Sequence, residues 1–187
     1  ARRACALFQR HEGRAHPDVA AALLEVGAAL ELSDRWLEAA RSYRRADHIL
    51  ARYARLRNPE VRRLRVQAAR ALCGVCRALG RYRESSVHGS RAITLANVHF
   101  GPMDLDYAGA LNDVGMLRKY QGRYAEAGRL YRRALAILRA AGMAEGVDAA
   151  SVYHNLGGVE HARGRYARAE GPARKAVALS LRALGPR

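Results

Sequence analysis

Several residue types are scarce in this chain, and each scarcity excludes a class of protein. Three cysteines among 187 residues cannot build a disulfide framework, so we expect a reducing compartment, the cytoplasm. The longest apolar stretch, residues 19–32, contains Glu25 and Glu31 and is too short to cross a bilayer. No charged segment followed by an apolar one opens the chain, so no secretory signal is visible. Because the first residue is not Met, we expect a piece of a longer protein.

Acidic residues and lysines are also few. Asp and Glu number 17 against 33 Lys and Arg, which gives a net charge of +16. Only Lys119 and Lys175 are lysines, so the excess is carried by arginine. Such a charge suits nucleic acid, an anionic membrane or an acidic protein as a partner. Half of the residues are hydrophobic, which argues against disorder.

What the chain does contain is an internal repeat. The triplet Gly-Arg-Tyr begins at Gly80, Gly122 and Gly164, at intervals of 42 residues, and Asp34-Arg35-Trp36 lies 46 residues before the first of these. Seven residues before each Gly stands a small residue: Cys73, Gly115 or Gly157. An alanine recurs after the triplet as Ala46, Ala92, Ala134 and Ala176. A fixed period of this length predicts a stacked repeat architecture.

Each repeat reads as two helices with apolar residues three and four apart. The Gly of the triplet, or Asp34, is expected at the left-handed residue that ends the first helix. The aromatic residue two positions later should begin the second helix. The small residue before the turn would let the two backbones approach closely. The first helices are predicted at residues 18–32, 61–79, 105–121 and 148–163.

These features resemble the tetratricopeptide repeat family. The resemblance is carried by the small residue of the first helix, the Gly-x-aromatic turn and the two small residues of the second helix, such as Ala127 and Ala134. The 42-residue period and the Leu184-Gly185-Pro186 ending are similar to the kinesin-light-chain type. The resemblance implies an all-α fold: a right-handed α-solenoid of antiparallel helix pairs, with the first helices on the concave side. Ser85 and Gly89 depart from the family's alanines.

The repeat predicts one array over residues 1–187. Residues 1–16 would be the end of a preceding second helix and a linker, followed by repeats at 17–59, 60–102, 103–146 and 147–187. Such arrays commonly accompany an ATPase switch, a protease or a DNA-binding domain in bacterial signalling proteins, as the resemblance implies.

The family's groove positions, carried over residue by residue, give a candidate binding surface. Arg and Lys there suit an acidic or carboxylate-bearing peptide, and Asn can bond both groups of a peptide backbone. The first repeat offers Leu24, Ala28, Glu31 and Leu32. The candidate partner-binding residues in the other repeats are Gln67, Arg70, Gly74 and Arg77, then Asn112, Met116, Lys119 and Tyr120, then Ser151, His154, Asn155, Gly158 and His161. The alternative for any one of them is a solvated helix face.

His154 and His161 form the sharpest chemical feature. They are seven residues apart on one helix, hence on one face but roughly 10.5 Å apart along the axis. Two histidines that share a zinc ion on a helix are normally three or four apart, so a metal site would need a further ligand, such as His99, Asp113 or Asp148. The alternative is two groove histidines that bind a peptide or water.

No catalytic arrangement is visible. The sequence has no phosphate-cradling loop, serine nucleophile elbow or carboxylate pair, so we expect no enzyme and no cofactor. Cys73 and Cys76 form a lone CxxC, which is better explained by close packing. Pro172 is expected to kink its helix without ending it.

Three functions follow, in order. The first is a protein-interaction module that holds a peptide or partner domain in its groove, as the sensor or scaffold part of a regulatory protein. The second is a metal-binding, small-ligand-binding or catalytic array centred on His154, His161, Lys119 and Tyr120. Nucleic-acid binding comes third, because a large share of the arginines recurs at solvated positions of the second helices, such as Arg44, Arg91 and Arg132. The oligomeric state is not predicted.

Overall fold

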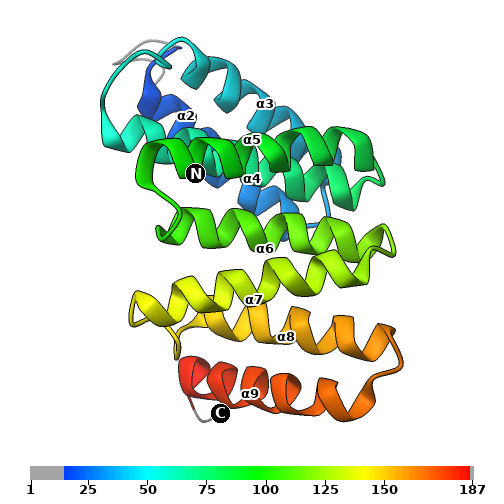
Figure 1. Cartoon of the computed structure of the whole chain (residues 1–187). Helices are drawn as coiled ribbons and strands as arrows, with labels where there is room; N and C mark the ends of the chain where they lie inside the picture. The colour runs from blue at the N-terminus through cyan, green and yellow to red at the C-terminus, as the bar shows by residue number, and fades with distance from the viewer. Residues whose placement is uncertain (1–14, 186–187) are drawn as a thin grey trace. The chain divides into compact units, whose positions relative to one another are not determined.

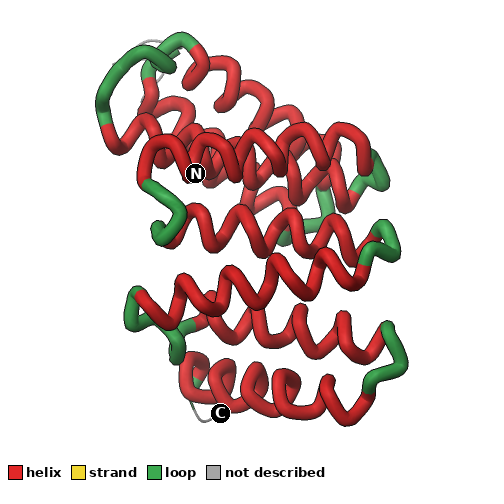
Figure 2. Tube along the Cα trace, viewed as in Figure 1, coloured by secondary structure: helices red, strands yellow, loops and turns green. Residues whose placement is uncertain are grey.

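The computed structural model describes residues 15–185, and this part of the chain is entirely helical apart from its connections (Figures 1 and 2). The helices are α2 (Pro17–Glu31), α3 (Trp36–Ala51), α4 (Pro59–Ala78), α5 (Tyr82–Phe100), α6 (Leu105–Tyr120), α7 (Tyr124–Ala140), α8 (Val147–Ala162) and α9 (Tyr166–Leu184). No strand occurs among the described residues. The prediction of an all-α helical repeat is confirmed. Of the predicted end of a preceding second helix and its linker, residues 1–16, the first 14 lie outside the described residues.

The same turn joins the two helices of every pair, as the sequence predicted. Gly80, Gly122 and Gly164 have φ near +70°, and Asp34 has φ of 54°. The arginine that follows each of them donates its backbone N–H to the carbonyl five residues earlier; the four bonds are 2.8 to 2.9 Å long. This is the bond that closes a helix at a left-handed residue. The four second helices begin at Trp36, Tyr82, Tyr124 and Tyr166, at the predicted positions.

The connections before α4 and α6 start the next helix with polar caps. The Asn58 side chain accepts hydrogen bonds from the backbone N–H groups of Glu60 and Val61, at 2.8 and 3.2 Å. Asp104 does the same for Asp106 at 2.8 Å. These bonds satisfy amides that have no partner inside the helix. Pro59 at the first helical position needs no such partner.

The chain divides into two compact units, one ending at His99 and the other beginning at Phe100. In the N-terminal unit, α2 packs against α3 and α4, and α3 packs against α4. Two ion pairs join α3 to α5: Arg44 with Glu84 at 3.0 Å, and Arg91 with Asp47 at 2.7 Å. The recurring arginines of the second helices therefore bridge neighbouring helices here.

Close helix contacts form where the sequence places small residues. A β-carbon on Gly27 would collide with the ring of Tyr43. Ser85, which departs from the family's alanine, is fully buried and donates a hydrogen bond to the Cys73 carbonyl oxygen at 2.7 Å. That bond explains how a hydroxyl is accommodated between α4 and α5. Cys73 and Cys76 are both buried thiols, as close packing predicts.

The C-terminal unit is a row of four antiparallel helices. Helix α7 packs against α6 and α8, α9 packs against α8, and α8 also touches α6 (Figure 1). Tyr131 of α7 is fully buried over Gly115 of α6, where a β-carbon would lie 2.5 Å from the tyrosine ring. Helix α9 continues through Pro172, as expected. None of the described helices is long and apolar enough to cross a membrane.

Candidate functional site

Most of the predicted binding residues lie on α6 and α8, and the C-terminal unit brings these two helices together. Asn155 of α8 donates a hydrogen bond from Nδ2 to Oδ1 of Asn112 on α6, at 3.0 Å. The Lys119 amino group lies over α8, where a β-carbon on Gly158 would be 2.9 Å from Nζ. Two pairs of residues chosen from the sequence are therefore neighbours in the structure.

The predicted residues differ in accessibility. Ser151, His154 and His161 are exposed on α8, Tyr120 on α6 is 58% exposed, and Asn112, Met116 and Lys119 are half-buried. Asn155 is only 7% exposed, so its side-chain amide has mainly a structural role, as the hydrogen-bond donor to Asn112. We expected this side chain to face a ligand; packing of α8 against α6 buries it instead.

In the N-terminal unit, α4 carries four of the predicted residues, and α2 corrects one expectation. Gln67 is exposed on α4, and the other three, Arg70, Gly74 and Arg77, are half-buried. Ala28 and Leu32 are exposed on or beside α2, but Leu24 is 2% exposed and belongs to the hydrophobic core. The expectation that Leu24 faces the groove is wrong, because α3 and α4 both pack on α2 and cover that stripe.

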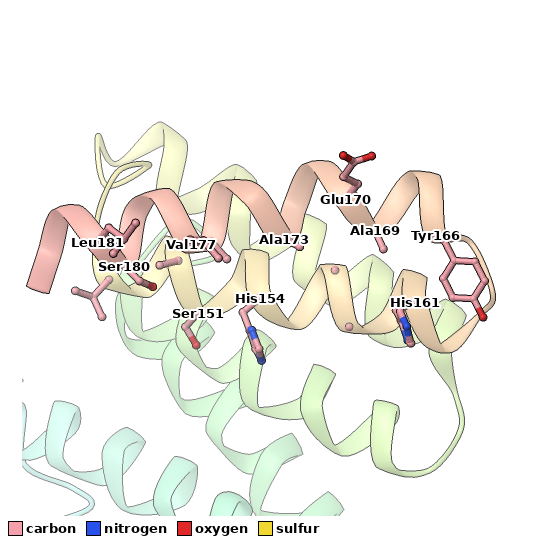
Figure 3. A pocket seen from close by; sticks show the side chains of 15 residues that line it. Ser151, His154, His161, Tyr166, Ala169, Glu170, Ala173, Val177, Ser180 and Leu181 are labelled. Atoms are coloured by element: carbon pink, nitrogen blue, oxygen red, sulfur yellow. The ribbon is translucent and has the colours of Figure 1, made fainter.

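A groove that the sequence did not predict lies between α8 and α9 (Figure 3). Its volume is about 790 Å³. Helix α8 contributes Val147, Ala150, Ser151, His154, Gly157, Gly158 and His161. Helix α9 contributes Tyr166, Ala169, Glu170, Ala173, Ala176, Val177, Ser180 and Leu181. Both sets follow three-and-four spacing, so each helix presents one continuous stripe to the groove.

The groove has an apolar floor and polar edges. Gly157 lies against α9, where a β-carbon would be 3.3 Å from the Ala169 carbonyl oxygen and the Ala173 nitrogen. Val147, Tyr166, Val177 and Leu181 are exposed around this floor. Ser151, His154 and His161 lie along the α8 edge, and Glu170 lies at the outer edge of α9 (Figure 3). Such a surface offers hydrophobic contact with a few oriented polar groups.

The two histidines of the predicted metal site both line this groove. The His161 ring meets the Tyr166 ring edge-on, with centroids 5.1 Å apart. Within residues 15–185, no group of three or more His, Cys, Asp and Glu side chains is close enough to hold a metal ion. The suggested third ligands are Asp148, which is exposed on α8, Asp113, which is half-buried on α6, and His99, which belongs to the other unit.

One acidic residue beside the groove has a lowered carboxyl pKa. Glu145, in the connection before α8, accepts a hydrogen bond from Lys175 of α9 at 2.7 Å and pairs with Arg182 at 2.6 Å. The hydrogen bond from Lys175 lowers the pKa of the Glu145 carboxyl, and the charges of Lys175 and Arg182 act in the same direction. This pairing holds the start of α8 close to α9.

Three solved structures illustrate the similarity of the fold, each at low sequence identity. BtubC (BKLC) from P. vanneervenii superimposes with a TM-score of 0.76 at 21% identity, over all of this chain and 75% of that one. A putative kinesin light chain with TPR-like repeats from Podosopora anserina gives 0.68 at 17% identity, over 96% and 83%. Aspartyl phosphate phosphatase F from Bacillus subtilis gives 0.72 at 15% identity, over 94% and 45%.

The sequence comparison decides the family. No curated protein matches the chain. The tetratricopeptide repeat model matches residues 64–140 and 106–182, which together span more than half of the chain. The turns, helix pairs and small-residue contacts described above are those that the repeat requires. The chain belongs to the tetratricopeptide repeat family.

Proposed function

We propose that this protein is an interaction module that binds an extended segment of a partner protein along the exposed faces of α6 and α8. Tetratricopeptide repeats stack into arrays whose extended surfaces bind other proteins. The observation that carries the proposal is the joining of α6 to α8 by the Asn112–Asn155 hydrogen bond. It makes the two helix faces one surface, on which Lys119, Ser151 and His154 are held by rigid elements.

The chemistry of this surface favours an acidic segment. Lys119 supplies a cation beside Gly158 of α8. The same helix carries exposed hydroxyl and imidazole groups at Ser151, His154 and His161. A carboxylate of the partner would accept hydrogen bonds from Lys119, and peptide carbonyls from the imidazole N–H groups. In the N-terminal unit, Arg70 and Arg77 provide the same kind of donor on α4. The module would act as the recognition part of a larger regulatory protein.

The test is selection of peptides from a random display library on the purified protein. Lys119→Glu reverses one charge of the proposed surface, and Arg133→Glu makes the same change on the exposed side of α7. We expect the parent and Arg133→Glu to enrich peptides with Asp or Glu, and Lys119→Glu to lose that enrichment. An unchanged peptide set with Lys119→Glu, or no enrichment of acidic peptides by the parent, contradicts the proposal.

A further inference from the structure

The outer face of α3 carries a row of basic side chains, which we call the α3 stripe. It consists of Arg41, Arg45, His48 and Arg52, which follow one another at spacings of four, three and four residues. At these spacings the four side chains lie on one face of the helix, over roughly 16 Å of its length. All four are exposed, and they lie opposite Tyr43, which is buried in the hydrophobic core.

No acidic residue of α3 neutralises the stripe. Helix α3 contains two carboxylates, and each is paired with an arginine outside the stripe: Glu38 with Arg35 at 2.6 Å, and Asp47 with Arg91 at 2.7 Å. Within residues 15–185, the side chains of the stripe form no ion pair with each other's neighbours or with any other helix. The stripe is therefore a water-exposed surface with charge of one sign.

The other second helices do not repeat this row. At the four equivalent positions, α5 has valine first and last, α7 has alanine at the last two, and α9 has glycine first and alanine third. The cations that α9 does carry there, Lys175 and Arg182, both pair with Glu145. On α5 the equivalent arginine, Arg91, pairs with Asp47. The unpaired charge of the α3 stripe is thus particular to this helix and not a property of the repeat.

Stabilisation of the helix does not explain the stripe. Cations favour the last turn of a helix, where the backbone carbonyl groups have no partner inside the helix. That effect accounts for His48 and Arg52, whereas Arg41 and Arg45 lie before the last turn of α3. The connection that follows α3 adds a further exposed cation, Arg55, beyond the end of the stripe. A row of this length and sign suits an extended polyanion.

The scarcity of exposed apolar side chains on α3 selects among the polyanions. Leu37, one turn before Arg41, is the only large apolar side chain that α3 exposes. A helix that binds an anionic membrane also inserts an apolar face, and the apolar face of α3 is buried against α2 and α4. Protein partners are held by apolar and aromatic contacts at the centre of an interface, and single-stranded nucleic acid by stacking on aromatic rings. A duplex presents its phosphates outward and needs only positive charge and hydrogen-bond donors.

We propose that the α3 stripe binds the phosphate backbone of a duplex nucleic acid without reading its base sequence. The guanidinium groups of Arg41, Arg45 and Arg52 donate hydrogen bonds to phosphate oxygens, and Arg55 extends the contact beyond the helix. Each neutralised phosphate releases counterions, so added salt weakens binding in proportion to the number of contacts. This function is separate from peptide binding on α6 and α8, and the failure of either proposal leaves the other standing.

The probe is a fluorescently labelled duplex of about 20 base pairs, longer than the stripe, made as DNA in two unrelated base sequences and as RNA. Binding to the purified protein is measured by fluorescence anisotropy at several salt concentrations. About four phosphate contacts predict a slope of roughly −3 to −4 for the logarithm of the association constant against the logarithm of the salt concentration. The two DNA sequences should bind within about twofold of each other, because no base edge is contacted.

Two double variants with the same change in net charge test the location of the site. Arg41→Glu with Arg45→Glu reverses two charges of the stripe, and Arg129→Glu with Arg133→Glu makes the same change at the equivalent positions of α7. We expect the α3 variant to lose about tenfold or more in affinity and its salt slope to become shallower by about 2. The α7 variant should change the affinity by less than about threefold. Folding of each variant is checked by circular dichroism.

The proposal is overturned if the parent binds neither the DNA nor the RNA duplex at low salt, or if the two double variants lose affinity equally. A clear preference for one of the two DNA sequences contradicts it as well, because the backbone is the same in both. Tighter binding of phosphatidylserine vesicles or of polyglutamate than of the duplex would assign the stripe to a membrane or to an acidic protein, and would overturn the proposal equally.

Discussion

The pair α6–α7 and the pair α8–α9 are two copies of one repeat, yet they differ in what covers them and in how they are held together. In the first pair, the large ring of Tyr131 fills the space over Gly115, and α8 covers the outer surface. The second pair has Ala173 at the place of Tyr131. Without the ring, Gly157 lies directly against the α9 backbone, and the outer surface is open. The buried side chains of the first pair stabilise the fold, whereas the exposed surface of the second pair is available for binding.

The largest loss of stability should follow removal of the Tyr131 ring, which has no counterpart in the second pair. Tyr131→Ala removes a fully buried side chain, and we expect the free energy of unfolding to fall by about 3–5 kcal/mol. Tyr120→Ala, in the exposed part of α6, should cost less than about 1 kcal/mol. Urea unfolding followed by circular dichroism measures both. Equal losses would mean that the ring of Tyr131 does not hold α6 and α7 together.

Truncation of apolar residues at equivalent positions of the two pairs should lower the unfolding free energy by unequal amounts. Leu135 of α7 is 4% exposed and its counterpart Val177 of α9 is 60% exposed. We expect Leu135→Ala to lower the unfolding free energy by about 2–4 kcal/mol and Val177→Ala to change it by less than about 0.5 kcal/mol. Thermal and urea unfolding of the two variants compare them. A large loss with Val177→Ala would show that the α8–α9 surface is covered in solution.

The hydrogen bond between the asparagines gives a third test. Asn112→Ala leaves the buried Asn155 amide without the acceptor of its 3.0 Å bond, and we expect a loss of about 1–3 kcal/mol. The double variant with Asn155→Leu should recover part of that loss, because it removes the stranded amide. A double-mutant cycle in urea measures the recovery. Full additivity of the two losses would show that the bond contributes nothing to the packing of α8 on α6.

Two helical glycines should respond in opposite directions. Gly74 of α4 has open space around its missing β-carbon, so Gly74→Ala should raise the unfolding free energy by about 0.5–1 kcal/mol. Gly157 touches the α9 backbone, so Gly157→Ala should destabilise the protein by about 1 kcal/mol. Both variants are compared by urea midpoint. Stabilisation by both substitutions would contradict the close approach of α8 and α9.

The smallest expected effect is the change in stability at acidic pH that comes from Glu145. Because pairing with Lys175 lowers the pKa of Glu145 in the folded protein, the carboxylate contributes stability above its ordinary pKa. That contribution is lost as the pH falls through the lowered value. Glu145→Gln should therefore unfold slightly more easily than the parent at pH 7, and the difference should vanish in acid, once the carboxyl is protonated in the folded protein as well. Added salt should shrink it as well. A difference that persists at low pH would have another cause.

Much of the fold could be predicted because residues with the same local effect on the backbone recur in all four repeats. Gly80, Gly122 and Gly164 end their helices at positive φ since a β-carbon would clash there, and the aromatic two residues later starts the next helix. Asn112 and Asn155 were selected from family positions, and the structure places them in contact. These features depend on residues close in sequence or one period apart.

Accessibility was harder to predict, because it depends on which helices pack on a given stripe. Leu24 and Asn155 occupy groove-like positions, but neighbouring helices bury both. The groove between α8 and α9 was missed, although the sequence contained its signal: the fourth repeat has Ala173, Glu170 and Leu181 where the third has Tyr131, Gly128 and Arg139. These departures from the repeat pattern lie on the surface where the packing of the fourth repeat differs from that of the third.

The sequence by itself determined the helix pairs, their turns and the family, because period, turn residues and small contact residues act locally. Only the tertiary structure decided which stripes are covered. Burial is a property of neighbouring helices, and two positions with the same place in the repeat can lie in a core or at an open groove. Leu135 and Val177 are such positions: Leu135 is buried in the core, and Val177 is exposed in the groove between α8 and α9.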